Sequence, residues 1–122
     1  MRRILLLTCV SWLAVSMALA QDVLKAAGGA ETHKVVLDNA QVRVLDVHLQ
    51  PGQKVGMHSH PANIVYYVTD GKIRVTLPDG KTAVHEVKAG TAVWNAPAIH
   101  AVENAGTAEM HLVQTEMKGT AE

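Results

Sequence analysis

Apolar and polar residues alternate with a period of two along most of the chain after residue 32. In residues 41–49 one face would carry Arg43, Leu45, Val47 and Leu49, and the other would carry Val42, Val44, Asp46 and His48. Successive side chains of a β-strand point to opposite faces, so this alternation predicts a strand. No segment in this part of the chain has the 3.6-residue period of an amphipathic helix.

The same pattern predicts a series of short strands separated by turn residues. We expect strands at residues 33–37, 41–49, 53–59, 63–69, 72–77, 81–87, 91–95, 99–103 and 109–117. Short segments that contain glycine, proline or aspartate, such as Pro51-Gly52 and Ala96-Pro97, lie between them. Many short strands at such spacing are typical of an all-β sandwich or barrel, in which closure leaves few exposed strand edges.

Two turns predict hairpins. Asp70-Gly71 lies between Val68 and Ile73 and has the composition of a two-residue hairpin loop, because Asp and Gly tolerate the positive φ that such a loop requires. The sequence 78–80, Pro-Asp-Gly, indicates a slightly longer turn. We therefore expect each flanking pair of strands to be antiparallel neighbours.

The first 20 residues look like a secretory signal peptide. Arg2 and Arg3 precede an apolar run, and Ala18-Leu19-Ala20 supplies the small residues that a signal peptidase recognises. The run is shorter than the roughly 20 residues of a membrane anchor, so cleavage after Ala20 is favoured over anchoring. We expect a periplasmic or secreted protein, free of the membrane after cleavage. Residues 21–32, rich in Ala and Gly, would form a flexible N-terminal arm or one that docks loosely on the barrel, and residues 33–118 would form the barrel domain.

Composition excludes several functions for residues 21–122. Cys9, the chain's one cysteine, lies in the expected signal peptide, so neither a disulfide nor a thiolate nucleophile is available. Without Arg2 and Arg3, nine Lys and Arg face eleven Asp and Glu, a net charge near −2, and these charges are scattered. Binding of nucleic acid therefore has no support.

Histidines carry the candidate chemistry. His58 and His60 are two apart within strand-like sequence, so their imidazoles would share one face and could bind the same metal ion. His100 follows a second glycine-led segment, but spacing alone does not place it near the first pair. The other four histidines have no partner at ligand spacing and are expected to be structural: His33, His48, His85 and His111.

These residues resemble the two motifs of the cupin superfamily, in particular its small secreted single-domain members. The first motif reads Gly-x5-His-x-His-x3,4-Glu-x6-Gly, and Gly52, His58, His60 and Gly71 match it. Gly90, His100 and Asn104 match the second motif, with a gap before the histidine that is one residue short. The resemblance covers about residues 35–117 and implies a double-stranded β-helix, or jelly-roll, barrel.

The chain departs from this pattern where cupins carry a metal-binding glutamate, because Ile64, or Val65 in the other count, stands there. The resemblance then implies a three-histidine site of His58, His60 and His100 for one divalent ion, namely Fe, Zn, Mn or Ni. Three neutral imidazoles leave the charge of the ion uncompensated, which favours a small anionic or chelating ligand. Some cupin dioxygenases for thiols and diketones resemble this arrangement. A non-catalytic sensor or scavenger remains the alternative, since the motifs contain no obvious general base.

Tyr66 is two residues from Ile64 in the same predicted strand, so both side chains would point into the barrel. Trp94 would lie close to the histidines. The expected pocket lining is mainly apolar and consists of Met57, Ile64, Tyr66, Trp94 and Ile99. Cupins commonly pair through a barrel face, so the resemblance also implies a homodimer as one assembly.

Overall fold

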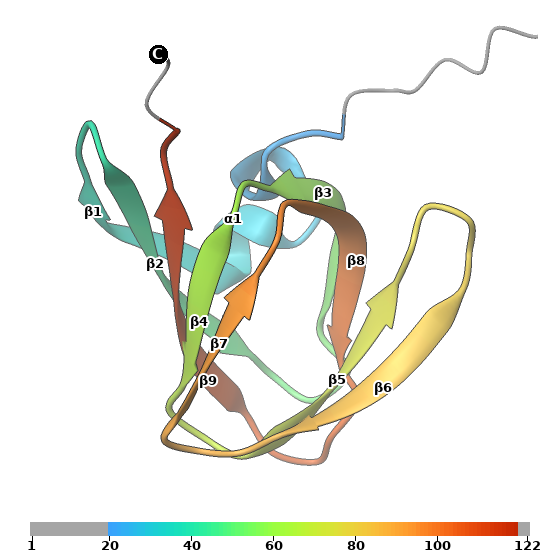
Figure 1. The fold of residues 1–122 in the computed structure, drawn as a ribbon. Coiled ribbons are helices and arrows are strands. Elements are labelled where there is room, and N and C mark those ends of the chain that lie inside the picture. Colours follow the sequence, from blue (N-terminus) through green and yellow to red (C-terminus); the bar gives the residue numbers. More distant parts are fainter. Residues whose placement is uncertain (1–19, 120–122) are drawn as a thin grey trace, which may run out of the picture.

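Two antiparallel sheets face each other in the computed structural model, which describes residues 20–119 (Figure 1). One sheet has the strand order β1-β2-β9-β4-β7, and the other has the order β3-β8-β5-β6. The strands of the first sheet are β1 (His33–Asp38), β2 (Val42–Leu49), β9 (Met110–Met117), β4 (Asn63–Tyr67) and β7 (Thr91–Asn95). Those of the second are β3 (Lys54–His60), β8 (Ala98–Asn104), β5 (Gly71–Thr76) and β6 (Thr82–Val87). The predicted all-β barrel is confirmed.

The core lies between the two sheets and is built mainly from aliphatic side chains. Strand β2 shows why the alternating pattern specifies it, since Leu45, Val47 and Leu49 are buried whereas His48 between them is exposed. Burying one such side chain stabilises the fold by about 1.5–3 kcal/mol. The rest of the core comes from Val23, Ala26, Val55, Val65, Val87, Met110 and Leu112.

The chain passes from one sheet to the other between β4 and β5, so the hairpin predicted at Asp70-Gly71 is wrong. Strand β4 pairs with β7 and β9, whereas β5 pairs with β6 and β8. Gly71 is required for space: a Cβ there would lie 2.5 Å from Cγ of the buried Met110. The second prediction is confirmed, because residues 78–80 connect the paired strands β5 and β6, with Gly80 at φ 84°.

The segment before β1 is folded onto the barrel, so of the two expectations for residues 21–32 the docked arm agrees with the structure better than the flexible one. It forms a 3-10 helix, η1 (Val23–Lys25), and a single helical turn, α1 (Gly29–Thr32). Val23 and Ala26 belong to the core, and Asp22 bridges to Ser59 of β3. A small residue allows this close docking, since a Cβ on Gly28 would collide with the carbonyl oxygen of Lys54 in β3.

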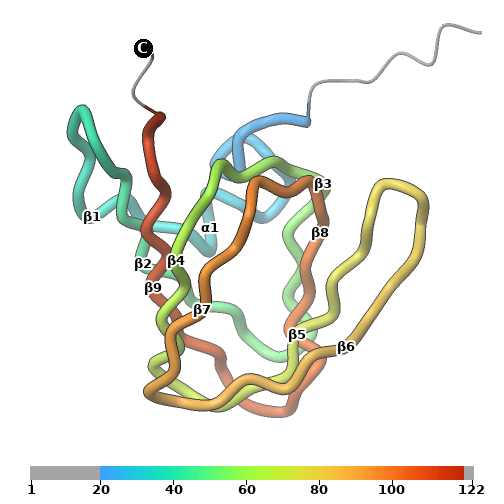
Figure 2. The backbone as a smooth tube through the Cα atoms, viewed as in Figure 1, coloured from blue at the N-terminus to red at the C-terminus, as the bar shows by residue number. Residues whose placement is uncertain are grey.

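Figure 2 follows the chain from this N-terminal segment to β9, whose C-terminal end lies at the same end of the barrel as that segment. Residues 1–19 of the expected signal peptide lie outside the described residues. Within residues 20–119, no helix has the length and apolarity needed to cross a membrane.

Candidate metal centre

A β-bulge in β3 turns the two histidines of the first motif inward. The pairing of β3 with β8 shifts between Val55 and His58, so Gly56 and Met57 interrupt the ladder. Without the bulge, Val55 and His58 would point to opposite faces. With it, Val55, His58 and His60 are all buried.

The N-terminal segment holds the bulge in place. The Gly56 N–H donates to the carbonyl oxygen of Ala27 at 2.8 Å, and the side chain of Gln21 donates to the Met57 carbonyl at 3.4 Å. The N-terminal segment therefore shapes the strand that carries His58 and His60.

Strand β8 brings His100 to these two histidines, directly opposite His58 in the ladder. The ring centroid of His58 lies 4.6 Å from that of His60 and 4.9 Å from that of His100, and the centroids of His60 and His100 are 5.5 Å apart. One ring nitrogen from each histidine lies within 4.8 Å of the other two, so the three side chains can hold one metal ion.

Hydrogen bonds fix the orientation of two of these rings. Nδ1 of His58 lies 2.7 Å from the Gly56 carbonyl oxygen, and Nδ1 of His60 lies 2.8 Å from Oε2 of Glu116. Both oxygens can only accept, so Nδ1 donates, and in the neutral imidazole Nε2 keeps its lone pair for a metal. Partners of this kind are the usual second layer around a metal site.

Glu116 is the buried end of a chain of charges behind His60, whose other members, Arg43 and Asp22, are partly exposed. Its Oε1 accepts a hydrogen bond of 2.6 Å from Nε of Arg43, and the guanidinium also donates to Oδ2 of Asp22 at 2.7 Å. Burial would raise the pKa of Glu116, but the hydrogen bonds from His60 and Arg43 outweigh it and lower that pKa. The carboxylate is therefore ionised at neutral pH and makes the His60 imidazole a better electron donor.

Two of the three candidate ligands, His58 and His100, are neutral at physiological pH. Burial and the neighbouring rings of His58 and His60 lower the pKa of His100 to about 4. Burial also lowers the pKa of His58, which the hydrogen bond to Gly56 only partly offsets. Metal binding requires neutral imidazole, so both rings are in the form that a metal needs.

The histidines lie at one part of a cavity of about 620 Å³ between the sheets. Side chains of both sheets line it, mostly apolar ones such as Val47, Val75 and Leu112, with a polar set formed by Asn63, Asn95 and Gln114. Gln114 and Asn95 donate to Oδ1 of Asn63 at 3.0 and 3.2 Å. The cavity therefore combines an apolar wall with a few fixed polar groups, as small-molecule sites commonly do.

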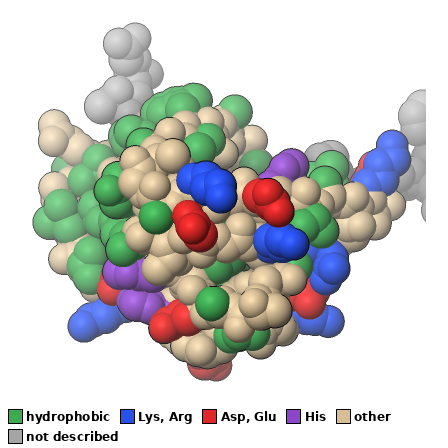
Figure 3. All heavy atoms as spheres, turned by 90° about the horizontal axis from the view of Figure 1, so that it is seen from below, with side chains coloured by type: hydrophobic (Ala, Val, Ile, Leu, Met, Phe, Trp, Pro, Cys, Tyr) green, Lys and Arg blue, Asp and Glu red, His purple; other side chains and the backbone are tan. Residues whose placement is uncertain are grey.

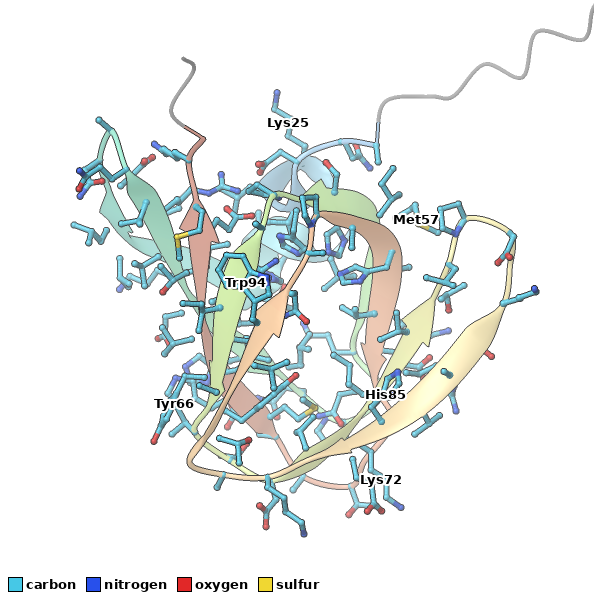
Figure 4. The ribbon with its side chains drawn as sticks, in the orientation of Figure 1. Lys25, Met57, Tyr66, Lys72, His85 and Trp94 are labelled. Carbon is cyan, nitrogen blue, oxygen red and sulfur yellow. The ribbon has the colours of Figure 1, made fainter. Side chains whose placement is uncertain are left out.

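None of the five residues expected to line the pocket lies in it, so that prediction is wrong. Met57 belongs to the bulge, and Ile99 lies beside the inward-facing His100 and therefore points outward. Figure 4 shows Met57, Tyr66 and Trp94 directed away from the barrel interior. Apart from Met57, the predicted lining residues are all exposed to solvent, with exposed fractions of 38% for Ile64, 47% for Tyr66, 61% for Trp94 and 36% for Ile99.

For Ile64, Tyr66 and Trp94 the error has one physical origin, the register of β4. This strand pairs with β9 so that Asn63 lies opposite Glu116 and Val65 opposite Gln114, and all four side chains are buried. Ile64 and Tyr66 must then face outward, as does Trp94 opposite Ile64. The cavity face therefore carries Val65, which has no ligand atom, at the position of the missing glutamate.

Three features of the structure were missed at the sequence level. Glu116 was detectable as a charge on the buried face of a strand that also carries Met110 and Leu112. His33 was expected to be merely structural, yet it lines the cavity, and burial together with His60 and His58 lowers its pKa to about 4. His48 and His111 become partners through the pairing of β2 with β9, which no local pattern reveals.

Comparison with known proteins assigns the family. The sequence profile of the cupin domain matches residues 45–115, so this chain belongs to the cupin family. It is 35% identical over 86 residues to the beta-alanine degradation protein BauB of Pseudomonas aeruginosa, a match that covers 69% of this chain and 90% of that protein.

Solved structures agree with this assignment. A cupin domain from Bordetella pertussis Tohama I is 26% identical, with a TM-score of 0.67 over 71% of this chain and 92% of that one. A conserved protein with a double-stranded β-helix domain from Klebsiella pneumoniae is also 26% identical, with a TM-score of 0.59 over 74% of this chain and 78% of that one.

Proposed function

We propose that this cupin binds one divalent transition metal ion through His58, His60 and His100 and uses it to act on a small chelating substrate. The carrying observation is that Nδ1 of His58 and of His60 each donates to an oxygen of the protein, which leaves both Nε2 atoms free beside His100. A bound ion would supply Lewis-acid or oxygen-activating chemistry, and Fe, Zn, Mn and Ni are the candidates.

The residues around the site support an anionic or chelating ligand. Val65 leaves the site without a carboxylate ligand, so the charge of the ion would be balanced by the substrate. The amide group formed by Asn63, Asn95 and Gln114 offers hydrogen bonds to a polar substrate. The apolar remainder excludes water from the bound substrate.

Dioxygenase activity is the reaction class that we favour, following the resemblance to three-histidine cupin dioxygenases. The relative BauB is named for the degradation of β-alanine, a small molecule with an amine and a carboxylate, so compounds of this kind are candidate substrates. Such compounds chelate metals, which fits the ligand class proposed for this site.

A non-catalytic binding module is the second candidate. Val65 in place of a carboxylate favours it, and so does the low pKa of His33, which makes this cavity histidine a weak base. The protein would then bind a metal or a small chelator without turning it over.

The first experiment measures bound metal. The purified protein and its His58→Ala, His60→Ala double variant are compared by inductively coupled plasma mass spectrometry, before and after anaerobic loading with Fe(II) or Zn(II). We expect about one equivalent at this site in the protein and none there in the variant. Equal metal content in both proteins would refute the site.

A second experiment separates the two functions. Oxygen consumption by the Fe(II)-loaded protein is followed with small thiols, diketones, phenolic acids and carboxylates related to β-alanine. Turnover that the double variant lacks supports the dioxygenase, whereas ligand binding without turnover across the set supports the binding module.

We also propose export to the periplasm or the exterior, with a mature chain that begins at Gln21. The docking of Asp22 and Val23 on the barrel is compatible with cleavage just before them. Intact-mass measurement of the protein recovered from cell fractions tests this, and a cytoplasmic protein that retains residues 1–20 would contradict it.

A further inference from the structure

A second group of potential metal ligands lies on the outer face of the five-stranded sheet, outside the cavity. Pairing of β2 with β9 places His48 directly opposite His111, and Asp46 is two residues from His48 on the same face of β2. The neighbouring Leu49 points into the core, so the sheet separates this group from the cavity histidines. Figure 3, which views the molecule from below, shows histidine and acidic side chains gathered together on the surface.

The geometry of this outer group converges on one carboxylate. Nε2 of His111 lies 2.5 Å from Oδ1 of Asp46, and Nε2 of His48 lies 3.3 Å from Oδ2 of the same residue. The two imidazoles are stacked, with centroids 4.0 Å apart and an interplanar angle of 13°. One ligand atom from each of the three residues lies within 4.8 Å of the other two.

Glu109 supplies the partner that such a site needs. Its Oε1 lies 2.9 Å from Nδ1 of His48, so in the neutral ring Nδ1 donates to Glu109 and Nε2 is left as the metal-binding atom. The outer group thus repeats, on the surface, the relation between Glu116 and His60 in the cavity.

We propose that Asp46, His48 and His111 form a second metal site, which takes Zn²⁺ or Cu²⁺ from solution. Two imidazoles and one carboxylate are borderline ligands that favour these ions, since the affinity of nitrogen and oxygen sites rises toward copper and zinc. A divalent ion would also balance the negative charges of Asp46 and Glu109. Water would complete the coordination, because these side chains are partly exposed, with His48 at 46% and His111 at 28%.

Two features of the surface act against the ion and limit its affinity. Lys34 of β1 lies opposite Asp46 in the ladder, so its ammonium group shares the same face. Without metal, the Asp46 carboxylate already contacts Nε2 of both imidazoles, and an ion would have to replace these contacts. The alternative to a metal site is therefore a hydrogen-bonded network of these side chains on the surface.

The test counts zinc equivalents and assigns each to its residues. The folded protein is equilibrated with Zn²⁺ at neutral pH, and the bound ion is measured by mass spectrometry and by competition with a chromophoric chelator. A His48→Gln, His111→Gln double variant removes the outer ligands, and a His58→Gln, His100→Gln double variant removes those of the cavity. His85→Gln is the matched control, since His85 is an exposed histidine outside both groups.

We expect one equivalent to disappear with the outer variant and to persist with the cavity variant and the control. Asp46→Asn should weaken that equivalent by at least about tenfold, while Asp38→Asn, another surface carboxylate on the same sheet, should leave it unchanged. Long-range ¹H–¹⁵N spectra should show the Nε2 resonances of His48 and His111 shifting together as that equivalent binds.

Zinc content that is the same in the protein and the outer variant would overturn the proposal. The result is independent of the cavity site: if the cavity binds no metal, the outer equivalent should still be present and still be lost with His48→Gln and His111→Gln. Circular dichroism confirms that each variant is folded, which is expected for partly exposed positions.

Discussion

His60 and Glu116 are joined by a buried hydrogen bond of 2.8 Å between Nδ1 and Oε2, although they are 56 positions apart in the chain. Both side chains are almost fully buried, with exposed fractions of 3% and 2%. The carboxylate therefore acts on the candidate metal centre from behind a ligand, without entering the cavity itself.

Replacement of this carboxylate by an amide should weaken metal binding without removing the site. In Glu116→Gln the neutral amide no longer draws the Nδ1 proton of His60, so we expect metal affinity to fall by about 10–100-fold. Competition titration against a chelator measures the change. Glu103→Gln is the matched control, because Glu103 forms an ion pair with Arg74 away from the cavity. Equal affinities of Glu116→Gln and the unaltered protein would contradict the role of Glu116.

Acid should destabilise the metal-free protein well above the pH at which carboxylates titrate. The folded protein keeps His33 and His100 neutral until their pKa values of about 4, whereas the unfolded chain protonates them near 6.5. The unfolded state then binds more protons in this window, so the free energy of unfolding falls as the pH drops from 6.5 to 4. Between about pH 7 and 5 we expect a loss of about 2 kcal/mol for each of these histidines.

Urea unfolding at several pH values measures this slope. His33→Gln removes one of the two groups and should flatten the dependence without abolishing it. A free energy of unfolding that stays constant from neutral pH to pH 5 would show that neither histidine is held neutral by the fold.

The register of β4 is tested by placing a charge on each of its faces. Val65→Glu puts a carboxylate against the cavity wall, and we expect the metal-free protein to lose at least about 2 kcal/mol of stability. Ile64→Glu is the matched control, since Ile64 is on the outside of the sheet, and its effect should stay within about 0.5 kcal/mol. The reverse order of the two effects would mean that Ile64 faces the cavity.

Docking of the N-terminal segment should be visible in the stability of the whole domain. Val23 is fully buried, so Val23→Ala leaves a cavity and should cost on the order of 2 kcal/mol. Val36→Ala, at a position with 54% exposure, serves as the control and should change stability by less than about 0.5 kcal/mol. Thermal unfolding compares them, and equal melting temperatures would indicate that the segment contributes nothing.

Much of the fold could be predicted because the strands are specified by patterns of residues close together in the sequence. Alternation and turn residues located all nine described strands to within a few residues, as for β7 at Thr91–Asn95. Which strands become neighbours is not local, and the turn at Asp70-Gly71 shows the difference. The dipeptide suits a hairpin, yet Gly71 is required by the side chain of Met110, far away in sequence.

The candidate site was predicted in part for the same reason. His58, His60 and His100 could be proposed from motif spacing, and the structure brings the three side chains together. The alternating pattern did not predict correctly which residues face the cavity after two points in the chain. These points are the bulge after Val55 and the turn before Asn63. Each shifts the pattern by one residue, which exchanges the two faces of a strand.

The chain of charges from Asp22 through Arg43 to Glu116 joins the two ends of the domain, so it can form only late in the synthesis of the protein. Asp22 lies at the start of the described chain, and Glu116 lies in its last strand, 73 positions after Arg43. A nascent chain that has emerged as far as the end of β8 contains all three histidines but not the carboxylate that orients His60, which lies in β9. Loop closure over such separations is slow compared with local pairing. The candidate metal centre therefore acquires its full set of hydrogen bonds only after the whole domain has emerged, and an unfinished chain holds the three histidines without the Glu116 carboxylate.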